Sequence, residues 1–146
     1  AFDRALKAGS GRPDVLLVVI DGNSAGSAAR KREVSEAIDV SNYPAVIVAT
    51  PEPCIERWYL ADPEAFLDRF GVQPPVSSPS DSCDELKRRL ISTLGEAGET
   101  VLTGGSEFAD DIVDAMDFYR AGRREPALKR FLDETRAVLK RLPAES

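Results

Sequence analysis

Two short apolar runs constrain the fold of this chain more than any other feature. The first covers Val15 to Ile20, and the second is "PAVIVAT" at residues 44–50. Runs of this length and Val content are typical of strands that are covered on both faces, as in a parallel sheet. The stretch between them predicts a helix capped by Ser24 and running to about Val40. Strand, helix and strand form a right-handed parallel unit, so we predict an α/β fold with a Rossmann-like parallel sheet.

Helical patterns dominate the rest of the chain. Their apolar spacing predicts five helices, at residues 54–60, 63–70, 84–94, 107–120 and 126–142. A Pro/Ser-rich segment at 72–82 reads as extended and exposed. We expect a single domain over 1–146, with an α/β part at about 1–71 and a helical part at about 82–142.

Two strands alone rarely make a stable sheet, so further strands are expected. One candidate is a short edge strand at Thr100 to Thr103. Another would precede residue 1, because Phe2 to Lys7 looks like the end of a helix whose beginning is missing.

The composition narrows the possible chemistry. The chain contains no histidine, which excludes Ser-His and Cys-His nucleophile pairs and imidazole metal sites within it. Cys54 and Cys83 lack metal-ligand spacing, and we expect two reduced thiols. The net charge of −6 argues against broad nonspecific binding of nucleic acid, although an enzyme can still meet phosphate through a cation. No stretch approaches the ~18 apolar residues of a membrane span, and no signal peptide is visible. We therefore expect a cytoplasmic protein with no membrane partner.

Acidic residues follow both predicted strands. Asp21 ends the first strand, and Glu52 and Glu56 lie just beyond the second. Parallel strands lie ~4.8 Å apart, and ligands bind beyond their carboxyl ends. Carboxylates this close repel unless a cation lies between them, and hard oxygen ligands suit Mg²⁺ or Mn²⁺. Asn23 would add a neutral oxygen.

Each acidic residue also has a purely structural interpretation. Asp21 begins an Asp-Gly-Asn sequence that is good turn chemistry by itself. Glu56, within "ERWYLAD", either pairs with Arg57 or points into a site. Asp62 precedes a proline and suits the cap of the helix that begins there.

Three segments of the chain carry a family resemblance. "DVLLVVIDGNSAG", "PAVIVATPEPCIERWYLADPEAFLDRFG" and "FADDIVDAMDFYRAGRREPALKRFL" together resemble small bacterial TOPRIM-like proteins of defence and mobile-element neighbourhoods, related to OLD-type nucleases. The resemblance spans about residues 14 to 140. It implies Mg²⁺-dependent phosphodiester chemistry, with a nuclease acting on nucleic acid as the first expectation.

The resemblance also assigns roles to four residues. Asp21 matches the first metal-binding aspartate, and Asn23 stands where the second is expected. Glu56 matches the glutamate of a "Glu-x-Trp" helix, and Asp62 matches the aspartate that ends this motif. The resemblance therefore implies a metal site of Asp21, Asn23, Glu56 and Asp62, with Asp21 and Glu56 catalytic.

Two departures from the family pattern keep other functions open. Asn23 removes one negative charge from the metal site, and the family's first glutamate is not found in the chain. A partner or a preceding segment would have to supply that glutamate. One alternative is a binding or regulatory module that has lost catalysis. A second is aspartate-based phosphotransfer, although the phosphatase pattern Asp-x-Asp-x-Thr fails at Asn23 and Ala25.

Overall fold

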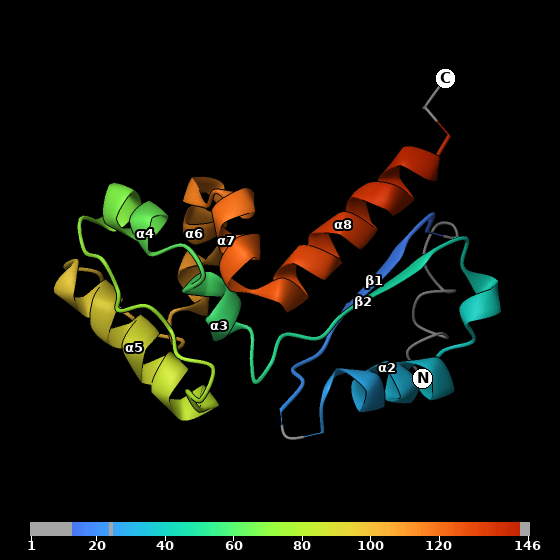
Figure 1. The fold of residues 1–146 in the computed structure, drawn as a ribbon, viewed down its shortest axis with the longest axis horizontal. Coiled ribbons are helices and arrows are strands. Elements are labelled where there is room, and N and C mark those ends of the chain that lie inside the picture. Colours follow the sequence, from blue (N-terminus) through green and yellow to red (C-terminus); the bar gives the residue numbers. More distant parts are fainter. Residues whose placement is uncertain (1–12, 24, 144–146) are drawn as a thin grey trace.

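A small parallel sheet lies at one end of the structure, a computed structural model that describes residues 13–23 and 25–143 (Figure 1). Strands β1 (Leu16–Val19) and β2 (Val46–Ala49) pair in parallel, with Leu16 opposite Val46. Helix α2 (Ser27–Ala37) connects them. The predicted strand–helix–strand unit is confirmed, and the chain is α/β with mostly helical content. The sheet has two strands among the described residues.

Helices cover the sheet from both sides. Helix α2 packs on one face, where Leu16, Val34, Ile38 and Tyr43 form a buried cluster (Figure 1). Helix α8 (Pro126–Arg141) crosses the other face and packs on β2. The prediction that both strands are fully covered is wrong for β1, because Leu17 and Val19 remain 49% and 52% exposed.

The ends of α2 differ from the prediction. The helix begins at Ser27, and Gly26 precedes it with a φ of 83°, a left-handed conformation that glycine adopts without strain. The predicted cap Ser24 lies outside the described residues. The helix stops at Ala37, and a separate 3-10 turn, Val40–Asn42, follows it.

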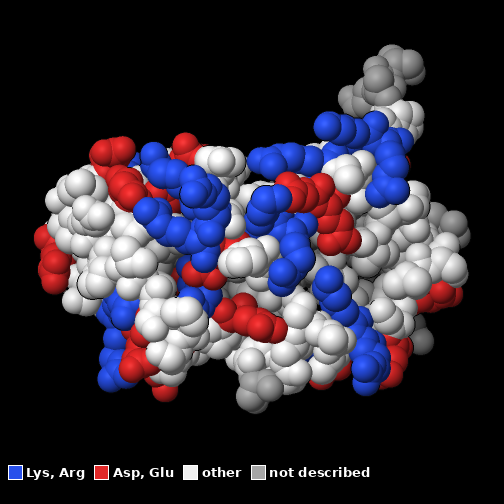
Figure 2. Space-filling view, in the orientation of Figure 1, with Lys and Arg blue, Asp and Glu red and all other residues white. Residues whose placement is uncertain are grey.

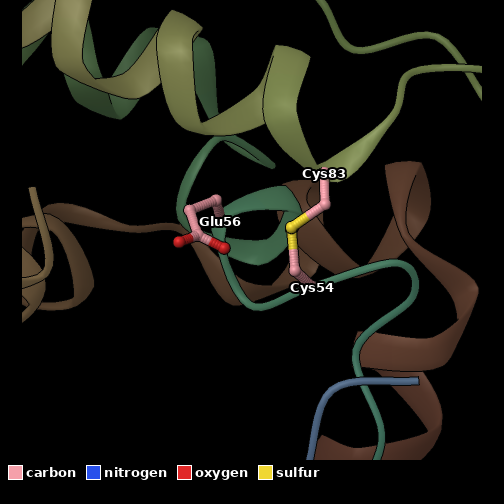
Figure 3. Close-up of side chains that lie close together, drawn as sticks. All are labelled: Cys54, Glu56 and Cys83. Atoms are coloured by element: carbon pink, nitrogen blue, oxygen red, sulfur yellow. A yellow bond between two sulfur atoms is a disulfide. The ribbon is translucent and has the colours of Figure 1, made fainter. Parts of the chain in front are cut away.

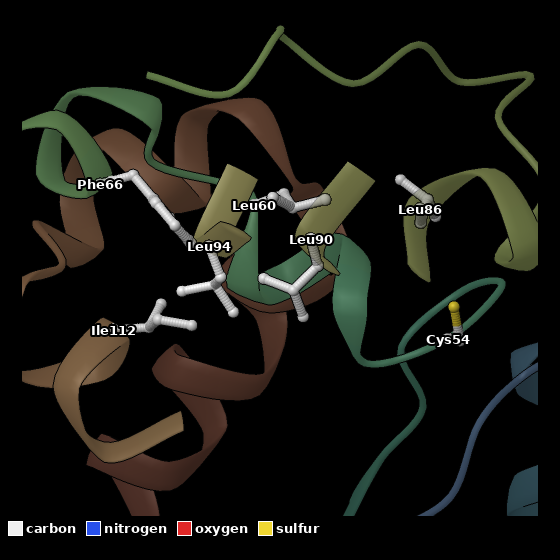
Figure 4. Close-up of a cluster of buried hydrophobic side chains, with 7 residues drawn as sticks. All are labelled: Cys54, Leu60, Phe66, Leu86, Leu90, Leu94 and Ile112. Atoms are coloured by element: carbon white, nitrogen blue, oxygen red, sulfur yellow. The ribbon is translucent and has the colours of Figure 1, made fainter. Parts of the chain in front are cut away.

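The second half of the chain forms a helical layer beside the sheet. Its remaining helices are α3 (Glu56–Tyr59), α4 (Pro63–Phe70), α5 (Cys83–Glu96), α6 (Ala109–Ala115) and α7 (Phe118–Arg124), with a 3-10 turn at Ser106–Phe108. Figure 4 shows their buried core, which consists of Cys54, Leu60, Phe66, Leu86, Leu90, Leu94 and Ile112. The helices predicted at 54–60, 63–70, 84–94 and 126–142 are confirmed, with ends shifted by a few residues.

The single helix predicted at 107–120 is wrong, because the chain turns at Met116 and Asp117. The backbone N–H of Asp117 donates a hydrogen bond to Asp62 Oδ2 over 2.8 Å. Its own carboxylate accepts from Arg120 N and so caps α7. Gly122 lies buried inside α7, where it packs against Lys129.

The edge strand predicted at 100–103 is also wrong. This segment is a loop folded around one carboxylate, that of Glu107. Glu107 accepts hydrogen bonds from Leu102 N, from Thr103 N and Oγ1, and from Gly105 N. The Thr103 hydroxyl contributes most to lowering the pKa of Glu107, to about 2. Backbone donors that a strand would offer to a neighbour are used here by a side chain.

Glu107→Gln is expected to flatten the acid dependence of stability. In the native chain the pKa of Glu107 falls from an ordinary 4.5 to about 2 on folding. Its carboxylate therefore contributes stability in full above about pH 4.5, and this contribution is lost as the pH falls toward 2. The free energies of unfolding of the native chain and the variant, measured in urea at several pH values, should converge as the pH falls. Glu99→Gln, which changes an exposed acid with no side-chain hydrogen bond among the described residues, should leave that dependence unchanged.

A disulfide joins the two halves of the structure. Cys54, after β2, is bonded to Cys83 at the start of α5, with 5.8 Å between their Cα atoms. The prediction of two reduced thiols is therefore wrong for this structure. Spacing in the sequence did not reveal the bond because 29 residues separate the two cysteines.

Two further expectations concern membranes and the beginning of the chain. Within the described ranges, the helices are all too short or too polar to cross a bilayer. The predicted helix end at Phe2 to Lys7, and any strand before it, lie outside the described residues.

Candidate functional site

The loops that follow the two strands run side by side beyond the sheet. Gly22 N donates to Pro51 O over 2.8 Å, and Asn23 N donates to Pro53 O over 3.0 Å. A Cβ on Gly22 would overlap the side chain of Glu52, so only glycine lets the two loops approach this closely. These bonds extend the parallel ladder and hold the residues after each strand in one place.

Asp21 connects these two loops through its side chain. Its Oδ1 accepts a hydrogen bond from Ile55 N over 3.0 Å. Ile55 immediately precedes α3, so the carboxylate helps to position the start of that helix. This bond occupies one lone-pair direction and leaves further acceptor capacity on the same carboxylate. The turn interpretation and the site interpretation of Asp21 are therefore compatible.

Glu56 is the first residue of α3 and does not pair with Arg57. Arg57 instead binds Glu125 over 3.3 Å and the carbonyl of Ser78 over 2.8 Å. The Oε2 atom of Glu56 is buried and accepts no hydrogen bond from the described residues. The ion-pair interpretation of Glu56 is thus wrong. A buried carboxylate oxygen without a partner is costly and uncommon in folded proteins, which makes it a candidate for a ligand contact.

Tyr59 has acidic surroundings. Burial contributes most to raising the pKa of its phenol, and the carboxylates of Glu56, Asp21 and Asp110 raise it further. Asp21 and Glu56 therefore act on the same phenol, as expected for acids at adjoining strand ends. Asp110 comes from the first turn of α6, and sequence reasoning missed it because α6 is distant along the chain.

Asp62 has a structural role in this fold. Its side chain is only 1% exposed and accepts hydrogen bonds from Nε and Nη2 of Arg120, each over 3.0 Å. It also accepts from Ala65 N, at 3.4 Å, and from Asp117 N. The predicted helix cap is confirmed, and the carboxylate is fully engaged. A cation at Asp62 would have to displace Arg120.

The predicted metal ligands are therefore not all gathered in one place. Asp21, Glu56 and Asp62 do not form a group of three close carboxylates among the residues that the structure describes. The group of three close donors that does occur there consists of Cys54, Glu56 and Cys83, whose ligand atoms lie within 4.8 Å of one another (Figure 3).

A polar cavity of about 460 Å³ opens beside the strand-end loops. Its walls carry Asn23 and Glu52 from these loops, the Arg57–Glu125 ion pair, and Arg130 of α8. Burial, the largest influence, raises the pKa of Glu125, although Arg57 opposes this effect. This cavity could not be predicted from the sequence, because its walls come from segments about a hundred residues apart.

Basic side chains gather on one face of this acidic protein, over α7 and along α8 (Figure 2). Arg120, Arg123 and Arg124 surround a surface hollow of about 400 Å³. Arg124 pairs with Glu64 over 2.6 Å, and Arg123 lies over the ring of Tyr119. Arg120 is held by Asp62 as described above. Carboxylates already neutralise two of these three guanidinium groups. The cluster is therefore more typical of a solvated helix end than of a phosphate-binding site.

No family model, curated protein or solved structure matches the chain.

Proposed function

We propose that this chain is a TOPRIM-like protein with a Rossmann-like sheet that binds Mg²⁺ or Mn²⁺ with Asp21 and Glu56. The observation that carries the proposal is the buried Oε2 of Glu56, which accepts no hydrogen bond from the described residues, together with the effect that Glu56 and Asp21 both exert on the Tyr59 phenol. Carboxylate oxygens are the ligands that Mg²⁺ and Mn²⁺ prefer.

Two carboxylates are sufficient for this class of cation. Mg²⁺ usually keeps several of its waters and takes only one or two protein carboxylates together with substrate phosphates. Asn23 would add an amide oxygen, whereas Asp62 is the least suitable of the four proposed ligands because Arg120 already holds it. A cation in this position supplies Lewis-acid polarisation of a phosphate and lowers the pKa of bound water.

The substrate that we propose is a phosphodiester, with nucleic acid as the partner and a nuclease as the enzyme class. The neighbouring cavity supports this choice. Arg130 lines it and forms no ion pair among the described residues, so its guanidinium remains available for a phosphate. A cytoplasmic location, and a partner or preceding segment that supplies the family's first glutamate, belong to the same proposal.

A catalytically degenerate binding or regulatory module is the second candidate. It is favoured by the engagement of Asp62 with Arg120, which leaves two of the three expected acids for a cation. Aspartate-based phosphotransfer is less suited to the geometry. The Oδ1 atom of Asp21 already accepts a hydrogen bond from Ile55 N, and Asn23 and Ala25 replace the second Asp and the Thr of the phosphatase pattern.

Calorimetric titration with Mg²⁺ and with Mn²⁺ tests the cation site. The native chain should bind one cation, and Asp21→Ala and Glu56→Gln should each weaken binding by about tenfold or more, since each removes a ligand oxygen. Asp114→Asn, which neutralises an exposed acid on α6, serves as the matched control and should bind normally. Circular dichroism of each variant verifies that the fold is retained.

Cleavage assays then separate the two candidates. Cation binding with Mg²⁺-dependent cleavage of DNA or RNA, lost in both site variants, would support the nuclease. Cation binding without cleavage would favour the degenerate module. If neither cation binds to the native chain, or if the Asp114→Asn control loses as much affinity as the site variants, the proposed cation site is wrong.

A further inference from the structure

Two cysteines and a glutamate from distant segments converge beside the core. Cys54 lies in the loop after β2, Glu56 begins α3 two residues later, and Cys83 is the first residue of α5. Figure 3 shows the carboxylate of Glu56 beside the disulfide. The two sulfur atoms and a carboxylate oxygen lie within 4.8 Å of one another. Thiolates in tetrahedral zinc sites are roughly 3.8 Å apart, as the usual Zn–S length of about 2.3 Å requires, so the two bonded sulfurs must separate on reduction before both can bind one ion.

The surroundings of Glu56 supply an independent indication of a ligand. Its Oε2 is buried and accepts no hydrogen bond from the described residues, and the adjacent disulfide offers no donor. A buried carboxylate oxygen without a partner is costly. A cation held by the Glu56 carboxylate and the neighbouring sulfurs would reduce that cost.

We propose that Cys54, Cys83 and Glu56 form a redox-gated site for a soft divalent cation of the Zn²⁺ class. The disulfide closes the site, and reduction opens it as a set of two thiolates and one carboxylate. Thiolate ligands select Zn²⁺ over Mg²⁺, so the site differs in chemistry from the Asp21 and Glu56 cation site. Three protein ligands leave the fourth tetrahedral position to water. This inference goes beyond the proposed function and does not depend on it.

A dithiol reductant can open the disulfide by two successive thiol–disulfide exchange steps. A thiolate of the reductant attacks Sγ of Cys83, because this residue is partly exposed whereas Cys54 is fully buried. The S–S bond breaks, Cys54 leaves as a thiolate, and Cys83 forms a mixed disulfide with the reductant. The second thiol of the reductant then displaces Cys83, so two electrons pass to the protein and the reductant becomes a disulfide. Zn²⁺ binds the two thiolates, and any protons that they carried are released.

Cys83 lies at the N-terminus of a long helix. Helix α5 has 14 residues, and Cys83 occupies its first turn, where the unpaired backbone N–H groups carry partial positive charge that favours an anionic ligand. Binding at this site would also withdraw Glu56 from Asp21, so the soft and hard cations compete for one carboxylate.

Titration with Zn²⁺ tests the site in the full chain before and after reduction with a phosphine, which does not compete as a thiol ligand. The reduced protein should bind one Zn²⁺, and the oxidised protein should bind at least about tenfold more weakly. Co²⁺ in place of Zn²⁺ should produce the thiolate charge-transfer absorption of a tetrahedral site. Equal binding by both forms, or no binding after reduction, would overturn the proposal.

Variants distinguish this site from the proposed Mg²⁺ site. Cys83→Ser should weaken Zn²⁺ binding by about tenfold or more while leaving the ligands of the proposed Mg²⁺ site in place, whereas Glu56→Gln should weaken binding of both cations. The exposed-acid control Asp114→Asn should leave Zn²⁺ binding unchanged. Alkylation provides a readout that needs no variant: the oxidised chain should expose no free thiol, the reduced chain two, and Zn²⁺ should protect both. Thiols that react before reduction, or that Zn²⁺ does not protect, would contradict the proposal even if Mg²⁺ binding is normal.

Discussion

Asp62→Asn is expected to lower the free energy of unfolding by about 3 kcal/mol. The carboxylate is almost fully buried and accepts charge-assisted hydrogen bonds from Arg120 as well as backbone bonds from Ala65 and Asp117. An amide has one acceptor atom and no charge, so it can satisfy only part of this set. The loss should therefore exceed that of an ordinary helix cap, which is about 1 kcal/mol.

Urea unfolding at neutral pH measures this loss, with Asp111→Asn as the matched control. Asp111 also pairs with an arginine, Arg69, but both side chains are nearly half exposed. Breaking that pair should cost less than about 1 kcal/mol. If Asp62→Asn leaves stability unchanged and instead abolishes Mg²⁺ binding, then Asp62 is a ligand, as its place in the family motif implies, and our structural assignment is wrong.

Leu90→Ala is expected to destabilise the helical layer by about 3 kcal/mol, within the range found for buried leucines. Leu90 is fully buried between its neighbours Leu86 and Leu94 on α5. Across from it, Gly105 comes so close that an added Cβ would lie 2.9 Å from the leucine side chain. Truncation therefore leaves a cavity that the surrounding helices can fill only in part.

Ile91→Ala is the matched control for Leu90→Ala, since Ile91 is the next residue on the same helix and is 41% exposed. Its truncation should cost about 2 kcal/mol less than that of Leu90, because a large part of the Ile91 side chain already contacts water. Thermal and urea unfolding of both variants give the comparison. Similar losses for the two residues would show that α5 does not pack in the orientation described.

Local patterns in the sequence predicted several elements correctly. The apolar runs at 15–20 and 44–50 predicted two parallel strands, although β1 is covered less completely than such a run implies. Asp62 followed by Pro63 predicted the start of α4, since the cap and the first helical residue are adjacent in the chain. Such signals depend only on residues within a turn or two of each other.

The errors arose where particular side-chain contacts, which apolar spacing does not record, decide the local conformation. The 107–120 pattern is helical throughout, yet the chain turns where Asp117 N meets the buried carboxylate of Asp62. The segment 100–103 resembles a strand, yet Glu107 takes up its backbone donors. The ion pair expected between the neighbours Glu56 and Arg57 does not form, because Arg57 binds Glu125 instead.

The sequence by itself determined the order of the first strands and helices, the cap at Asp62 and the acidic residues that follow each strand. These depend on side-chain periodicity and on hydrogen bonds between neighbours, which a linear pattern records. Only the tertiary structure decided that Asp62 is held by Arg120, that Asp110 joins Asp21 and Glu56 around Tyr59, and that Cys54 meets Cys83. Those contacts depend on how the helical layer packs against the loops after β1 and β2, and burial then determines which carboxylate is neutralised and which remains available.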